Sequence, residues 1–242
     1  MYSASINGNA TTFGTSGLLY RSNKVMYDRE TNTLWSQLLG EPIVGPLVGS
    51  GVKLEFFPVA LTTWGEWLQE HPDTVVMSLD TGVYRPSQYE PENDERSIYY
   101  GYRARAEPLF PVWDRDDRLD AKDEVLGLSI DGEHRAYPIS TLQQRRLVPD
   151  SLNGVQLVVL GSALSSEARA YRTRGTEFSL PDNVTDAFPR VLLDGNGEEW
   201  TVTDSSLIKA SDSETTRSAV PANVSFWFGW RAFHSDTDVY AP

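Results

Sequence analysis

PVALTTWGEWLQEHPDT (58–74) and PANVSFWFGWRAFHSDT (221–237) are two versions of one pattern, and this pattern decides the fold prediction. Pro, two Trp, His, Asp and Thr recur at six identical spacings, and each residue is repeated 163 positions later. Trp and His are among the rarer amino acids, so chance does not readily produce such a match. The sequence therefore predicts a degenerate internal repeat.

Each copy of the pattern predicts a short helix. The two tryptophans and the histidine fall at i, i+3 and i+7, which is one face of a helix. Thr63 and Ser225 are the expected N-caps. We expect strand, helix and strand in order over 54–77 and over 217–240, with Trp64 and Trp227 buried. The residues assigned to this structural pattern are Trp64, Trp67, His71, Trp227, Trp230 and His234.

Two alternatives apply to these side chains. The tryptophans suit a helix face packed on a sheet, or else a stacking platform for a sugar or another ligand. The two helix histidines suit a C-terminal position favoured by the helix dipole, or else metal ligation. The structural interpretation is preferred for both.

The remaining sequence predicts mainly short strands. Residues 18–28 and 51–61 are strand-like, and Asp131-Gly132 between apolar runs predicts a hairpin turn. Upstream of the helices, 26–35 corresponds to 192–200 and Phe13 to Phe178. We predict a β-dominated α+β fold of two repeats about a pseudo-twofold axis. Its boundaries are 1–81 (an incomplete first repeat), 82–120 (a long surface connection) and 121–242 (a complete second repeat), packed as one unit.

Composition excludes several classes of function. The net charge is -13, and only four of the 21 basic residues are lysines, which argues against binding nucleic acid. Such an acidic, lysine-poor surface suits high salt, although ordinary drift toward acidity is the alternative. The absence of cysteine excludes disulfides, iron–sulfur clusters and thiol nucleophiles. The sequence contains no run of 18 apolar residues, so no membrane span is predicted, and the N-terminus lacks the pattern of a signal peptide.

The sequence also resembles a known family. The segments FGTSGLLYRSNKVMYDRETNTLWSQLLGEPIVGPL (13–47), TTWGEWLQEHPDT (62–74), DGEHRAYP (131–138) and FWFGWRAFHSDTDVY (226–240) are similar to domain-of-unknown-function family 3179. The resemblance implies a mostly extracytoplasmic bacterial and archaeal protein, common in haloarchaea, of a family without an established activity. Asn9, Asn183 and Asn223 match the glycosylation pattern and fit export.

The chain departs from the family it resembles in its first copy. Full members have two units that each open with a DG-x-x-x-AYP strand pair, followed in the first unit by a cysteine-containing strand. Here the first copy starts only near Phe13, so that strand pair and that cysteine strand are absent. The second copy reads VVLGSALSS (158–166) where cysteines would align. We therefore expect apolar edge strands near residues 10–27, covered by a second copy of the chain, another subunit, or residues 82–120 folded back. An intermolecular cover is preferred.

One polar cluster is the candidate ligand site. Asp28 and Arg29 lie among aromatic residues, and an Asp–Arg pair can bind a small polar ligand through the guanidinium fork. The alternative is a turn capped by Asp28, with Arg29 stacked on a ring. The full candidate set is Ser16, Tyr20, Asn23, Tyr27, Asp28, Arg29 and Trp35.

No catalytic set has a recognisable spacing. Ser16 would need to meet one of three histidines, and its Gly-rich surroundings suggest a bulge or tight turn instead. The acidic runs at 90–96 and 114–118 lack calcium-loop spacing, so we predict no metal and no cofactor. The sequence favours a non-enzymatic extracytoplasmic binding or assembly module. The alternative is an enzyme, or the remnant of one, acting on a small polar substrate near Asp28 and Arg29.

Overall fold

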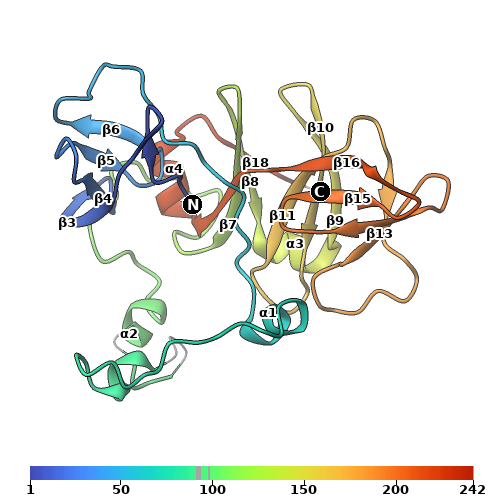
Figure 1. The fold of residues 1–242 in the computed structure, drawn as a ribbon, viewed down its shortest axis with the longest axis horizontal. Coiled ribbons are helices and arrows are strands. Elements are labelled where there is room, and N and C mark those ends of the chain that lie inside the picture. The colour runs from blue at the N-terminus through green and yellow to red at the C-terminus, as the bar shows by residue number, and fades with distance from the viewer. Residues whose placement is uncertain (91–93, 98, 242) are drawn as a thin grey trace.

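The protein is built mainly of antiparallel strands, with a few short helices (Figure 1). The structure is a computed structural model that describes residues 1–90, 94–97 and 99–241. Residues 91–93 and 98 of the predicted connection therefore lie outside the described residues. The helices are α1 (Trp64–Glu70), the 3-10 helix η1 (Pro86–Tyr89), α2 (Tyr100–Arg103), α3 (Ile139–Arg145) and α4 (Trp227–Phe233).

The N-terminal strands form a meander at one end of the molecule (Figure 1). A small hairpin, β1 (Ser5–Ile6) and β2 (Asn9–Ala10), precedes it. The four-stranded sheet has the order β3 (Phe13–Tyr20), β4 (Asn23–Asp28), β5 (Leu34–Ser36) and β6 (Glu41–Val44). The edge strand β3 leaves the side chains of Leu18 and Leu19 exposed.

A second four-stranded sheet carries helix α4. Its order is β17 (Ala222–Phe226), β7 (Glu124–Ile130), β8 (Glu133–Pro138) and β18 (Asp238–Val239). The predicted hairpin is confirmed, with Asp131-Gly132 in left-handed backbone conformation at its turn. β17 pairs antiparallel with β7, and β18 pairs parallel with β8. The chain on both sides of α4 is thus held by one hairpin.

The largest sheet has eight strands. Their spatial order is β12 (Phe178–Ser179), β13 (Val191–Asp194), β14 (Glu199–Val202), β15 (Ser206–Lys209), β16 (Asp212–Val220), β11 (Ala168–Arg172), β10 (Val155–Gly161) and β9 (Leu147–Leu152).

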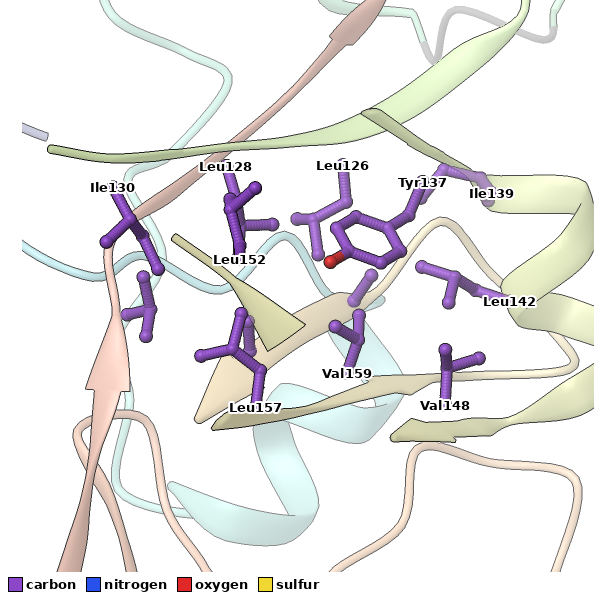
Figure 2. Close-up of a cluster of buried hydrophobic side chains, with 13 residues drawn as sticks. Leu126, Leu128, Ile130, Tyr137, Ile139, Leu142, Val148, Leu152, Leu157 and Val159 are labelled. Atoms are coloured by element: carbon purple, nitrogen blue, oxygen red, sulfur yellow. The ribbon is translucent and has the colours of Figure 1, made fainter. Parts of the chain in front are cut away.

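The main core lies between the β7–β8 hairpin, α3 and strands β9–β11. Figure 2 shows Leu126, Leu128 and Tyr137 of the hairpin facing Leu157 and Val159 of β10. These side chains are at most 2% exposed, so they exclude water and fix the hairpin in place.

Several sequence predictions are corrected. Residues 18–28 form a hairpin, because Arg21 and Ser22 adopt the positive φ angles of a two-residue turn. Residues 51–61 form only an isolated bridge between Phe56 and Tyr2. Helix α4 is capped by Phe226 without a side-chain hydrogen bond, and not by Ser225. In contrast, Thr63 does cap α1 as predicted.

The prediction of strand–helix–strand order in both copies is half wrong. The second copy has β17, α4 and β18, whereas the first has only α1 flanked by irregular chain. The side chain of Trp227 is 1% exposed, as expected, but that of Trp64 is 50% exposed. The cause is the hairpin, since β7 and β8 pair with the strands beside α4, whereas no hairpin of the described residues pairs with the chain beside α1.

Candidate functional site

A cleft of about 610 Å³ lies between the N-terminal sheet region and the sheet that carries α4. We call it the central cleft. Its walls include Tyr2, Glu41 and Lys53 on one side, and residues of β7, β8, β11 and α4 on the other. These segments are far apart in the sequence, so the fold alone brings them together.

Three aromatic rings form one wall of the central cleft. His234 stacks on Trp230 with ring centroids 4.0 Å apart, because residues i and i+4 of a helical turn are neighbours. His134 of β8 lies against the same histidine, with ring centroids 4.2 Å apart, and also meets the Trp230 ring edge-on at 6.4 Å. The indole Nε1 of Trp230 donates to Thr237 Oγ1 at 2.9 Å, which fixes the ring. Gly127 makes room for it, since a Cβ there would lie 2.3 Å from the indole.

His234 is the group of the central cleft with the most unusual environment. Its residue is 8% exposed, and burial, together with the nearby His134, lowers its pKa to about 4. The imidazole is therefore neutral near pH 7, with one nitrogen as donor and the other as acceptor. Within the described part of the chain, neither nitrogen has a hydrogen-bond partner. Neither nitrogen is among the fully buried unpaired atoms, so both keep some exposed surface and can bond to a molecule in the cleft.

The charges around the central cleft are only partly balanced. Lys53 forms an ion pair with Glu41 at 2.5 Å. Burial and the neighbouring Glu41 raise the pKa of Tyr2 to about 12, so this phenol stays protonated. Arg172 lines the cleft, and its guanidinium makes no ion pair or hydrogen bond with any described residue. It is therefore available to an anion.

Ser129 and His134 of the central cleft are in contact, and Asp236 lies near them outside its lining. Ser129 Oγ lies 2.7 Å from His134 Nδ1, and His134 Nε2 lies 4.0 Å from Asp236 Oδ1. Ser129 and His134 are cross-strand partners in the hairpin, which accounts for the short contact. The Asp236 distance is too long for a hydrogen bond, so the imidazole is not oriented by it.

The Asp28 carboxylate is buried and committed to its own turn. Its oxygens accept hydrogen bonds from Thr31 N at 2.5 Å, Thr31 Oγ1 at 2.8 Å and Trp35 Nε1 at 2.8 Å. Burial by itself raises the pKa of Asp28, but these hydrogen bonds outweigh it and lower the pKa below the usual range. Arg29 lies with its guanidinium 5.3 Å from the ring centre of Tyr27. This is the turn-and-stacking alternative given by the sequence.

The other residues of the predicted ligand set are dispersed around β3–β5. Ser16 lies in a β-bulge and donates to the Val25 carbonyl, away from any histidine contact among the described residues. Tyr20 packs edge-on against Phe233 of α4. The side-chain oxygen of Asn23 is buried and unpartnered among the described residues. Trp35 is fully buried. Their binding role stays a prediction, and none of the set lines the central cleft.

The sequence reasoning missed a buried charged cluster beside α1. Arg169 pairs with Glu167 at 2.5 Å and with Asp204 at 2.8 Å. Burial raises the pKa of Glu167 despite the nearby arginines. Arg190 joins the cluster to Glu70 of α1 through an ion pair. The cluster connects α1 to the region of the eight-stranded sheet. Its members are far apart in the sequence, so no local sequence pattern predicts it.

Two further properties concern all described residues. No helix among them is long and apolar enough to cross a membrane. Across the same residues, no three His, Asp or Glu side chains gather closely enough to hold a metal ion.

Comparison with known proteins gives one family. The profile described as "Protein of unknown function (DUF3179)" matches residues 1–237, so the chain belongs to this family. No curated protein and no solved structure matches the chain.

Proposed function

We propose that this member of the DUF3179 family is a non-enzymatic binding module that holds a small organic anion in the central cleft. The observation that carries the proposal is His234, whose neutral imidazole lies at the cleft wall and makes no hydrogen bond with any described residue, although its nitrogens keep some exposed surface. A ligand that donates to or accepts from this imidazole satisfies it.

The ligand class follows from the neighbouring groups. Arg172 supplies an unpaired guanidinium, whose planar fork matches a carboxylate. The partly exposed His134 ring, backed by the buried rings of Trp230 and His234, presents aromatic surface to the cleft, which suits a planar ligand group. Asp131, the other charge of the cleft without an ion pair among the described residues, is exposed at the hairpin turn, where water screens it. A small planar carboxylate fits these features.

Benzoate is a suitable probe. We expect titration with benzoate to shift the Trp230 indole and His234 ring resonances. Arg172→Gln should weaken binding about tenfold or more, because a charge-assisted pair contributes about 1.5–3 kcal/mol. Arg174→Gln is the matched control, since Arg174 is exposed two residues along and does not line the cleft. Equal affinities of the two variants, or no shift at tens of millimolar benzoate, would refute the proposal.

The enzyme alternative is favoured by one contact only. The Ser129–His134 distance of 2.7 Å permits proton transfer from the serine. We propose that it does not support acyl transfer, since Asp236 does not orient the imidazole. Labelling with a fluorophosphonate tests this. Rapid labelling that Ser129→Ala abolishes would establish a hydrolase instead. Near Asp28 and Arg29 the carboxylate is already saturated, so that site offers an enzyme no free base.

Matching local geometry supports a two-repeat architecture with a pseudo-twofold axis, as a proposal. Phe13 pairs with Asp28 and Phe178 with Asp194, each in an antiparallel register. The Asp194 carboxylate accepts from Trp200 Nε1 as Asp28 does from its own tryptophan. We retain the units 1–81, 82–120 and 121–242. Superposition of the two units in an experimental structure tests the axis.

Assembly and an extracytoplasmic, saline location also remain proposals. Support for assembly comes from the exposed edge strand β3, with Leu18 and Leu19 in solvent. The connection over residues 82–120 contacts the turn after β3, where Ser22 donates to the Pro111 carbonyl. Light scattering at physiological and molar salt tests assembly through residues 10–27, with Leu19→Lys beside the parent. A monomeric parent in both conditions removes the case.

A further inference from the structure

Residues 56–84, which we call the acceptor segment, expose an unusual amount of apolar surface. Apart from the bridge at Phe56 they form no strand, and α1 is their one regular element. Monomeric proteins rarely expose large contiguous apolar patches, so such a surface marks an interaction site. The exposed large apolar side chains are Phe57, Val59, Leu61, Trp64, Val75, Val76, Met77, Leu79, Val83 and Tyr84.

The same chain contains a covered version of this segment. Helices α1 and α4 are both seven residues long. Their C-caps are His71 and His234, with φ and ψ of -128 and 66 degrees and of -128 and 72 degrees, respectively. The second tryptophan of each helix donates from Nε1 at 2.9 Å to a threonine seven residues later. The local structure at the C-terminal end is therefore the same in both helices.

The difference lies in what packs against the helix. Around α4, the β7–β8 hairpin pairs with β17 and β18. Val125 and Ala136 of this hairpin bury Trp227 and Trp230, and Gly127 admits the Trp230 ring. Around α1, the corresponding chain is unpaired and Trp64 is half exposed. The acceptor segment is thus a hairpin-binding surface without its hairpin.

The way α1 is attached leaves this surface free. Glu66 accepts a hydrogen bond from Phe188 N at 3.2 Å, and Glu70 pairs with Arg190. The polar side of the helix therefore holds it to the chain that leads into β13, while half of the Trp64 surface stays exposed. The chain's own β7–β8 hairpin cannot serve both helices, because Leu126, Leu128 and Tyr137 are built into the main core.

The charge of the acceptor segment defines the partner further. Residues 56–84 contain four acidic residues and neither Lys nor Arg, and two of the four, Asp73 and Asp80, are not used to hold α1 to the rest of the protein. In the covered copy, a cation completes the cover, since the Arg118 guanidinium lies 5.3 Å from the centre of the Trp227 ring. A basic partner satisfies both observations.

We infer that the acceptor segment binds a basic β-hairpin of another protein, which adds strands beside α1 and places a glycine against Trp67 and a cation over Trp64. This is recognition by strand addition, in which main-chain hydrogen bonds give affinity and side-chain fit gives specificity. The inference is independent of the ligand proposed for the central cleft.

A cyclised peptide with the sequence of residues 122–140, carrying Glu124→Lys and Glu133→Lys, is the probe. We expect it to bind the full chain, with amide shifts confined to residues 56–84. A matched peptide with Gly127→Val should bind at least about tenfold more weakly, because its side chain occupies the space that the tryptophan ring needs.

Two protein variants locate the site. Trp64→Ala and Val76→Asp should each weaken peptide binding about tenfold or more, while the circular dichroism spectrum stays that of the parent. The inference is overturned if the peptide does not bind at about 1 mM, if the Gly127→Val peptide binds equally well, or if the shifts map to α4. It is also overturned if the parent self-associates in a way that Trp64→Ala abolishes, since the occupant is then a second copy.

Discussion

Replacing the two equivalent tryptophans by alanine separates the role of the β7–β8 hairpin from that of the local helix. Trp227 is 1% exposed, packs against Val125 and Ala136, and donates from Nε1 to the Asp116 carbonyl at 3.0 Å. Complete burial of about 200 Å² at about 25 cal/mol per Å² contributes about 5 kcal/mol. This agrees with the cost of about 3–5 kcal/mol for removing a core tryptophan.

The Trp64→Ala substitution should lower the free energy of unfolding much less than Trp227→Ala. Half of the Trp64 surface is already in water, so the same arithmetic gives at most about 2.5 kcal/mol. Urea unfolding followed by far-UV circular dichroism measures both variants without relying on tryptophan emission. With a slope of about 2 kcal/mol per molar, Trp227→Ala should lower the midpoint by about 2 M and Trp64→Ala by about 1 M or less.

Trp113→Ala is the control for a tryptophan that is 81% exposed, with an expected cost below about 0.5 kcal/mol. Equal shifts for Trp64→Ala and Trp227→Ala, at unchanged slopes, would mean that both rings are buried. In that case the hairpin does not distinguish the two helices, and both the fold description and the acceptor segment are wrong.

Three further predictions concern single sites. The pKa of His234 is lowered to about 4 in the folded protein, against about 6.5 unfolded. As pH falls below 6.5, His234 is therefore protonated in the unfolded chain before it is protonated in the folded one. The free energy of unfolding should drop for this reason by up to about 3 kcal/mol toward pH 4. Urea titrations of a His234→Gln variant across that range should lack this part of the drop. Asp28→Ala should destabilise by about 2–3 kcal/mol by leaving the Trp35 indole N–H unpaired, as thermal unfolding would show, whereas an unchanged melting temperature would contradict its capping role. Gly127→Ala should cost about 1–3 kcal/mol by forcing Trp230 aside, and a fully stable variant with an unshifted indole resonance would show that the ring is not seated there.

Local structure was predictable where neighbouring residues determine it. The period of the Trp and His residues predicted both helices, and the Asp131-Gly132 turn predicted the β7–β8 hairpin. The Asp28 cap followed from residues within seven positions along the chain. In each case the hydrogen bonds or the turn geometry lie within one short segment, so no tertiary partner has to be known.

Burial and the central cleft were not predictable for the opposite reason. Trp64 and Trp227 occupy the same position of the repeated pattern, yet among the described residues only Trp227 meets a hairpin, and burial depends on that partner. His134 and His234 are far apart along the chain and stack only because α4 lies on β7 and β8. The single signal available in the sequence was the scarcity of histidine, since only three occur and two of them meet.

If the chain is a repeat as proposed, features present in both copies are expected to serve folding, whereas features present in one copy are candidates for function. The tryptophan–threonine bonds, the tryptophan–histidine stacks and the aspartate–tryptophan bonds occur twice, which is expected of devices that a unit needs in order to fold. His134 has no counterpart on α1, and the hairpin that carries it covers α4 alone. Arg29 is also unique to one copy, but it lies on Tyr27 and not in the central cleft. The two proposals therefore assign the copies different roles: the covered copy is proposed to enclose a ligand, and the uncovered copy is proposed to present a surface on which a partner strand pair completes the same structure.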